Sequence, residues 1–192
     1  MVLLAGFCWS ASGIGVRLIE TASVWQIVLH RSVSMSFFLF AVIYQMRRQN
    51  PIRLALQEGM SGVICGLALV VSYVAGIFSL QNTSVAHTLL LFSTAPFMTA
   101  LLARIFLGEI IHWQTLIAIA IALAGVLVMV VGDATTSARL GDLAALAAAL
   151  GFAVFTIFLR RGKSSDMMPS VLLSGLLGIP IMVLICLQMG QT

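Results

Sequence analysis

The chain has 192 residues, of which 61 % are hydrophobic and only 8 % are charged, and its mean hydropathy is +1.13. A soluble domain of ordinary composition carries about 25 % charged residues, and one of about 150 residues removes only about 70 % of its surface from water. The composition therefore excludes a soluble enzyme, a nucleic-acid-binding domain and a disordered segment. It indicates a protein embedded in lipid.

About 20 mostly apolar residues are needed for a helix to cross the hydrocarbon core of a bilayer. Seven stretches meet this requirement: residues 2–19, 25–46, 60–80, 85–107, 115–131, 143–159 and 168–189. The first has no basic leader, so we interpret it as a retained helix rather than a signal peptide. The connections are short, and we expect an all-α, polytopic transmembrane helix bundle whose function lies within the membrane.

Basic residues are distributed unevenly between the two sides of this bundle, although the net charge is only +4. The second, fourth and sixth connections lie on one side and hold seven basic residues: Arg47, Arg48, Arg53, Arg104, Arg160, Arg161 and Lys163. The other side has Arg17 and Arg139. Cytoplasmic loops are enriched in Lys and Arg. This bias predicts a multi-pass protein of the cytoplasmic membrane, with its amino terminus in the cytoplasm and its carboxyl terminus outside.

The chain partly repeats itself at an offset of 143 positions, at which Ile14 aligns with Ile157 and Arg17 with Arg160. Five crossings separate the two copies, and this odd number means that the second copy is inverted in the membrane. Inverted repeats with a binding site at their interface are a recurring architecture of transporters.

Three stretches carry a resemblance to a known family. The first is the opening helix with Phe7-Cys8-Trp9-Ser10 and Arg17, followed by Arg31 early in the next helix. The second runs from Ser84-Val85-Ala86-His87 through Ser93-Thr94-Ala95-Pro96-Phe97 to Gly108-Glu109. The third is the stretch of residues 121–126, which closes on Gly132-Asp133. With these stretches the sequence resembles the EamA-type members of the drug/metabolite transporter superfamily. The resemblance implies ten helices in two inverted five-helix units, and transport of small metabolites or drugs by alternating access.

The same resemblance implies the domain organisation. Residues 1–132 correspond to the first five-helix unit, and residues 140–192 to the first two helices of an incomplete second unit. We expect a homo-oligomer or a missing C-terminal half to supply the remainder. The alternative is a non-transporting membrane subunit, or an inactive fragment, that packs with a partner.

Ionisable side chains inside a bilayer are costly and are therefore candidates for function. Arg31 either faces a central cavity, where it attracts an anionic group of the substrate, or extends to the outer headgroups. His30 points about 100° away from it, so the two cannot both face the cavity. His87 is either a proton-titrating group of the substrate pathway or a neutral histidine bonded to a neighbouring helix.

Pro96 falls near the middle of the fourth span and leaves the carbonyl of Phe92 without its helical donor. Ser93 and Thr94 lie beside that gap and can satisfy the carbonyl or leave it to a substrate, although a simple packing kink is the alternative. The remaining pathway candidates are mid-membrane side chains whose polar atoms need partners: Trp9, Ser12 and Tyr73.

Glu109, in the turn after the fourth span, is either a latch to Arg104 or to a loop backbone at the inner gate, or a solvated carboxylate. All six acids lie at or near predicted helix ends, so we expect no buried carboxylate to carry protons. We predict no metal site, no cofactor and no enzymatic activity, because paired acids and clustered histidines are absent from the spans. A retinal protein is disfavoured because the lysine, Lys163, lies in a loop.

Small residues recur in two spans. Gly62 and Gly66 have GxxxG spacing, and residues 143–151 are rich in alanine. Such faces allow helices to approach closely, so we expect them to mediate packing. The cysteines Cys8, Cys65 and Cys186 have no paired spacing, and we interpret them as small hydrophobic residues.

Overall fold

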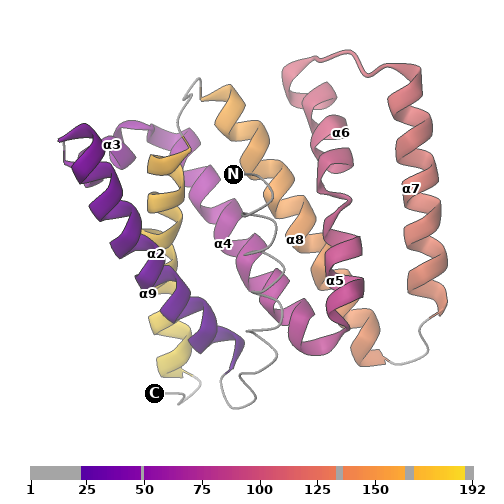
Figure 1. Ribbon diagram of the computed structural model, residues 1–192, viewed down its shortest axis with the longest axis horizontal. Helices are drawn as coiled ribbons and strands as arrows, with labels where there is room; N and C mark the ends of the chain where they lie inside the picture. The colour runs from indigo at the N-terminus through magenta and orange to yellow at the C-terminus, as the bar shows by residue number, and fades with distance from the viewer. Residues whose placement is uncertain (1–22, 49, 133–135, 163–166, 189–192) are drawn as a thin grey trace.

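The computed structural model describes residues 23–48, 50–132, 136–162 and 167–188 (Figure 1). Within these ranges the chain forms helices and no strand. The helices are α2 (Val24–Arg47), α3 (Pro51–Gln57), α4 (Gly59–Asn82), α5 (Val85–Phe92), α6 (Ala95–Leu107), α7 (Trp113–Gly132), α8 (Thr136–Arg161) and α9 (Met168–Gln188). The predicted span at residues 2–19, with the candidates Trp9 and Ser12, lies outside the described residues.

Five segments of the described chain are long and apolar enough to cross a membrane. They are Val24–Met46, Gly59–Asn82, Val85–Leu107, Arg139–Arg161 and Met168–Gln188. They confirm five of the spans predicted from hydropathy, and α7 coincides with a sixth. The protein is a polytopic all-α bundle, as the composition predicted.

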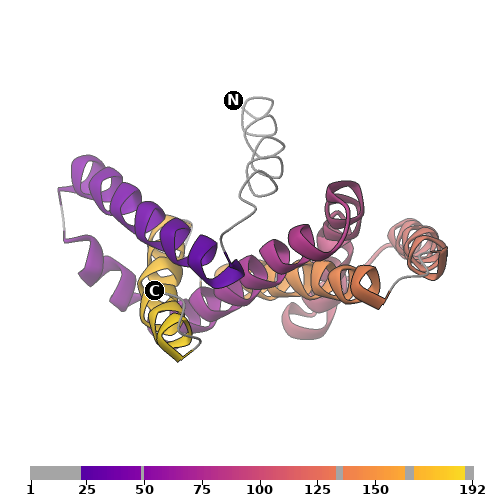
Figure 2. The same ribbon diagram turned by 90° about the horizontal axis from the view of Figure 1, so that it is seen from below.

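The helices form a row with α4 and α8 at its centre (Figure 1). On one side, α9 packs against α4 and α2 packs against α9; on the other side, α5 and α6 pack against α8. The view from below shows α7 at the far end of the row (Figure 2). The C-terminal ends of α2, α6 and α8, which carry the basic residues, all lie at the upper edge of Figure 1. The unequal charge of the connections is therefore a difference between the two ends of the bundle.

Small residues bring α4 into contact with both of its neighbours. A Cβ added to Gly66 would lie 3.3 Å from the backbone nitrogen of Ser174 on α9. On the other face of α4, the Ser72 hydroxyl donates a hydrogen bond to the carbonyl of Ala148 on α8 at 2.8 Å. The prediction that these small residues mediate packing is confirmed. Cys65 and Cys186 are free thiols buried between helices.

The second connection, which follows α2, contains a short helix. Arg48 ends α2 in a left-handed conformation with φ at 51°. Asn50 then caps α3 by accepting a hydrogen bond from the Ile52 amide at 3.1 Å, and Pro51 occupies the first helical position. An Asn-Pro pair is a recognised helix start. Hydropathy did not reveal α3, because seven residues are too few for an apolar pattern to register.

Candidate functional site

Arg31 lies about two turns into α2, and its position follows from how α2 begins. Ser23 accepts a hydrogen bond from the Gln26 amide at 3.4 Å, and the Gln26 side chain accepts one from the Ser23 amide at 3.1 Å. This capping box fixes the start of the helix. Arg31 then points toward α4, where its guanidinium carbon lies 3.6 Å from the centroid of the Tyr73 ring. Two sequence candidates from different helices thus form a cation–π pair.

His30 turns away from this pair. Its side chain is exposed, and Nδ1 lies 2.9 Å from the carbonyl oxygen of Gln26, one turn earlier in the same helix. Arg31 is only half-buried, but its charged group contacts the neighbouring helix rather than extending away from the bundle. The prediction that the two side chains face different directions is confirmed.

The predicted fourth span is interrupted at Ser93 and Thr94, where α5 ends and α6 begins. The Ser93 hydroxyl donates to the carbonyl of Leu90, and the Thr94 hydroxyl donates to that of Leu91, each at 2.6 Å. The sequence left open whether these hydroxyls satisfy the carbonyl of Phe92 or leave it to a substrate; in the structure they bond to the carbonyls of Leu90 and Leu91.

Pro96 explains the position of the interruption. It falls in the first turn of α6, where a missing N–H is tolerated because the first amides of a helix have no partner within it. The hydroxyls therefore satisfy the preceding carbonyls, and the chain passes from α5 into α6 through Ser93 and Thr94. Thr94 is buried, whereas Ser93 and Pro96 are exposed.

A buried acid lies at the end of the bundle opposite the basic residues. Asp142, on α8, is 0 % exposed. Its Oδ1 accepts a hydrogen bond from the Thr83 hydroxyl at 3.0 Å and lies 3.4 Å from Nδ1 of His87. We call Thr83, His87 and Asp142 the Asp142 cluster. It joins the C-terminal end of α4 and the first turn of α5 to the first part of α8.

Two local features build the Asp142 cluster. The Ser84 side chain caps α5 by accepting a hydrogen bond from the His87 amide at 3.1 Å, which places His87 in the first turn. Gly141 lets α8 approach the end of α4, since a Cβ there would lie 2.9 Å from the backbone nitrogen of Thr83. The next residue, Asp142, is thereby brought beside the Thr83 hydroxyl.

The Asp142 cluster corrects one conclusion drawn from sequence. Asp142 lies only three residues from the N-terminal end of the apolar segment Arg139–Arg161. This position near a helix end suggested that the Asp142 side chain is exposed. In the structure its carboxylate is covered by α4 and α5. The expectation that no buried carboxylate exists was wrong because burial here depends on the neighbouring helices.

The opposite end of the bundle carries an exposed ion pair. Glu109 lies in the connection between α6 and α7, and its two carboxylate oxygens lie 3.4 and 3.5 Å from Nη1 of Arg160 on α8. Both side chains are about half exposed, at 52 %. The predicted partner Arg104 is exposed and does not pair with Glu109 in the described chain. The latch of Glu109 to Arg104 is therefore corrected to a pair with Arg160.

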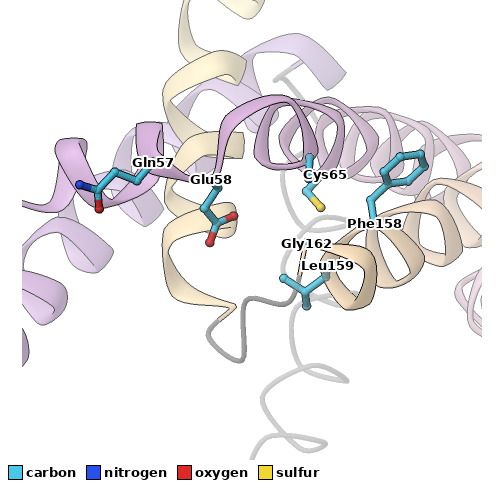
Figure 3. A pocket seen from close by; sticks show the side chains of 7 residues that line it. Gln57, Glu58, Cys65, Phe158, Leu159 and Gly162 are labelled. Atoms are coloured by element: carbon cyan, nitrogen blue, oxygen red, sulfur yellow. The ribbon is translucent and has the colours of Figure 1, made fainter.

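The same end holds a cavity of about 220 Å³ between α4 and α8. Figure 3 shows Glu58, at the start of α4, beside this cavity, together with the Cys65 thiol and residues of α8. The Glu58 carboxylate accepts a hydrogen bond from the Ser170 hydroxyl of α9, and Ser170 is fully buried. Glu58 thus links the start of α4 to α9 and is occupied by a structural contact.

Comparison with known families assigns the chain to a family. Residues 1–131 match the EamA-like transporter family. The chain belongs to this family. The match covers more than half of the sequence and includes α2 to α7. No curated protein and no solved structure matches the chain.

Membership of the EamA-like family and the five apolar segments make the chain a multi-pass membrane protein of transporter type. The matched region contains Arg31, Tyr73, the interruption between α5 and α6, and His87. Asp142 and Arg160 lie beyond it, on α8. The His87–Asp142 and Glu109–Arg160 contacts therefore each join the matched part of the EamA-like chain to α8, one at either end of the bundle.

Sequence reasoning missed two of the residues just described, Asp142 and Glu58. A signal for Asp142 was available: glycine directly before an acid, followed by an alanine-rich apolar run, is suited to a helix start that approaches another backbone closely. Glu58 precedes Gly59, which has a positive φ of 61° and marks the junction of α3 and α4. Neither signal identifies the partner across the bundle.

Proposed function

We propose that this protein carries a small organic molecule with an anionic group across the cytoplasmic membrane by alternating access. The observation that carries the proposal is the Arg31–Tyr73 pair, which places a guanidinium between two membrane-spanning helices. Charged side chains at such positions in membrane proteins mark substrate or ion pathways.

The geometry of the pair suits recognition of a carboxylate or phosphate. The Tyr73 ring covers one face of the guanidinium and stabilises its charge, while the N–H groups at the edge of the guanidinium point in the plane. No acidic side chain of the described chain pairs with Arg31. An anionic substrate would complete the site by accepting two parallel hydrogen bonds from the guanidinium edge.

Alternating access requires two units that move against each other, and the crossing of α2 and α9 supports inverted units. An offset of 143 carries the bounds of α2 to residues 167 and 190, close to α9 (Met168–Gln188). At the crossing, Ser32 meets its own equivalent: a Cβ on Gly175 would lie 3.3 Å from the Ser32 carbonyl oxygen. Contact between equivalent residues is expected where a two-fold axis passes.

The interruption between α5 and α6 adds to this argument. Transporters build binding sites from helices that are broken within the membrane, because the ends of half-helices offer polar backbone groups there. Thr94 and Ser93 provide hydroxyls at the interruption. They are the second set of groups that we assign to the pathway.

The orientation of the protein follows from the charged end of the bundle. We place the ends of α2, α6 and α8 in the cytoplasm because basic residues are retained on that side. The Glu109–Arg160 pair then lies at the inner end and the Asp142 cluster at the outer end.

The test is uptake of radiolabelled carboxylates by the chain reconstituted in liposomes, with a panel of mono- and dicarboxylates and amino acids. For the carboxylates that the wild-type chain transports, Arg31→Gln lowers uptake at least tenfold. Tyr73→Phe, which keeps the ring, retains uptake, and Tyr73→Ala does not.

Arg53→Gln is the matched control, because Arg53 is an exposed arginine on α3 outside the pathway. It leaves uptake unchanged. Equal uptake by the wild-type chain and Arg31→Gln, with both proteins folded, would contradict the assignment of Arg31.

A further inference from the structure

The Asp142 cluster contains a carboxylate whose charge is incompletely compensated. Asp142 is fully buried, and its Oδ1 accepts a hydrogen bond from the Thr83 hydroxyl. Its Oδ2 is also buried and has no hydrogen-bond partner among the described residues. A buried carboxylate is strongly destabilised unless a positive charge or a proton neutralises it.

We propose that His87 and Asp142 together form a proton-binding site that takes up one proton from the water outside and releases it during the transport cycle. The inference rests on the proposed function and names its coupling ion. His87 is the group that can share the proton, because its Nδ1 lies 3.4 Å from Oδ1 of Asp142. With one proton the pair is neutral overall, on either side chain; without it the pair carries one buried negative charge.

The exposure of the two side chains defines the route of the proton. The His87 side chain is 22 % exposed, whereas that of Asp142 is 0 % exposed. The Nδ1 atom of His87 is itself buried, so the exposed part of the ring lies on its other atoms. The imidazole therefore has one edge toward water and one toward the carboxylate, and it passes the proton between them.

The other groups near the pair do not replace this role. From α4 the side chain that contacts the pair is that of Thr83, and its hydroxyl does not titrate. Ser79 on α4 and Thr88 on α5 are hydrogen-bonded to each other at 2.8 Å, and neither titrates. Arg139, three residues before Asp142 on α8, is a charged side chain of the same helix, and it is exposed.

Loss of the proton links the pair to movement. In the structure α5 covers Asp142 through His87, and this arrangement is favourable while the pair is neutral. Once the proton leaves, the bare carboxylate is stabilised by water, and separation of α5 from α8 admits it. Proton binding thus favours the closed outer end, and proton release favours opening.

Infrared difference spectroscopy on the chain in phosphatidylcholine vesicles tests the inference without any transported substrate. Spectra are compared across about pH 5 to 8, the range in which histidine changes its charge. The wild-type chain shows carboxyl and imidazole changes that Asp142→Asn removes, and His87→Gln shifts the pH at which the carboxyl change occurs. Identical spectra for the wild-type chain and Asp142→Asn would overturn the proposal.

His112→Gln is the matched control, since His112 is exposed and lies in the connection between α6 and α7, at the end of the bundle opposite Asp142; it leaves the Asp142 carboxyl signal unchanged. If Asp142→Asn fails to elute as a folded protein, Thr83→Val replaces it, because it removes one hydrogen bond and moves the same signal. A carboxyl signal that responds to sodium at constant pH, and not to pH, also overturns the proton assignment.

The infrared experiment and the uptake assay together separate the two proposals. Uptake of carboxylates without an Asp142 signal retains the proposed function and overturns the proton site. An Asp142 signal without any uptake retains the proton site and overturns the proposed function.

Discussion

At Gly151 the backbone of α8 lies against the backbone of α4. A Cβ at this position would lie 2.9 Å from the carbonyl oxygen of Ala68 and 3.1 Å from the amide nitrogen of Ser72. Both neighbours are backbone atoms and cannot rotate away, unlike the end of a flexible side chain. The Ser72–Ala148 hydrogen bond lies in the same interface. Glycine is therefore required here by the distance between the helices.

This contact gives the first stability prediction. Gly151→Ala forces α4 and α8 apart and destabilises the folded chain by about 1–3 kcal/mol, the usual range for overpacking. Gly125→Ala is the control, because a Cβ on Gly125 meets nothing within 4 Å. Thermal unfolding in detergent, followed by circular dichroism, measures both variants. Equal midpoints for the two variants would contradict the packing argument.

The identities of the polar residues within spans were predictable from sequence, but their partners were not. Arg31, Tyr73 and His87 were recognisable because polar groups are rare in apolar segments. The pairing of Arg31 with Tyr73 depends on how α2 and α4 cross. The same limit applies to Asp142, whose burial is produced by α4 and α5 and by nothing in its own helix.

Among the elements, α5 and α6 differ most from the hydropathy pattern. One apolar segment of 23 residues, Val85–Leu107, contains two helices. Hydropathy reports the length of a segment and not its hydrogen bonds, so the segment was predicted as one span. Pro96 indicated an irregularity, but the structure shows a restart in which Ser93 and Thr94 cap the preceding carbonyls.

Removal of Pro96 is expected to restore a continuous helix. Alanine at this position supplies an N–H that can donate to the carbonyl four residues earlier. Spin labels at the exposed positions Ala86 and Ile105 report the change, because a continuous helix separates them by roughly 28 Å along its axis. In Pro96→Ala the measured distance distribution narrows and moves toward this value.

Pro180→Ala is the control for this measurement. Pro180 lies inside α9, which continues through it, and α9 is distant from α5 and α6 in the row. The distance between the two labels stays unchanged in this variant. An unchanged distribution in Pro96→Ala as well would show that Ser93 and Thr94, and not the proline, cause the interruption.

At the scale of the whole molecule, the two ends of the bundle differ in chemistry. The end at which α2, α6 and α8 finish carries the basic residues, the exposed Glu109–Arg160 pair and the cavity beside Glu58. The other end carries the buried Asp142 cluster. Both sets of contacts fasten α8 to the matched region, one at each end of the bundle.

Cysteine labelling tests this two-sided arrangement in a background in which Cys8, Cys65 and Cys186 are replaced by serine. Arg53→Cys and Gln81→Cys place exposed thiols near the opposite ends of α4. Because basic loops remain in the cytoplasm, intact cells treated with a membrane-impermeant maleimide label Gln81→Cys and label Arg53→Cys only after permeabilisation. The reverse pattern would contradict the orientation while keeping the bundle. Labelling of both thiols in intact cells would contradict the crossing of the membrane by α4 itself, since these thiols are separated by the length of that helix.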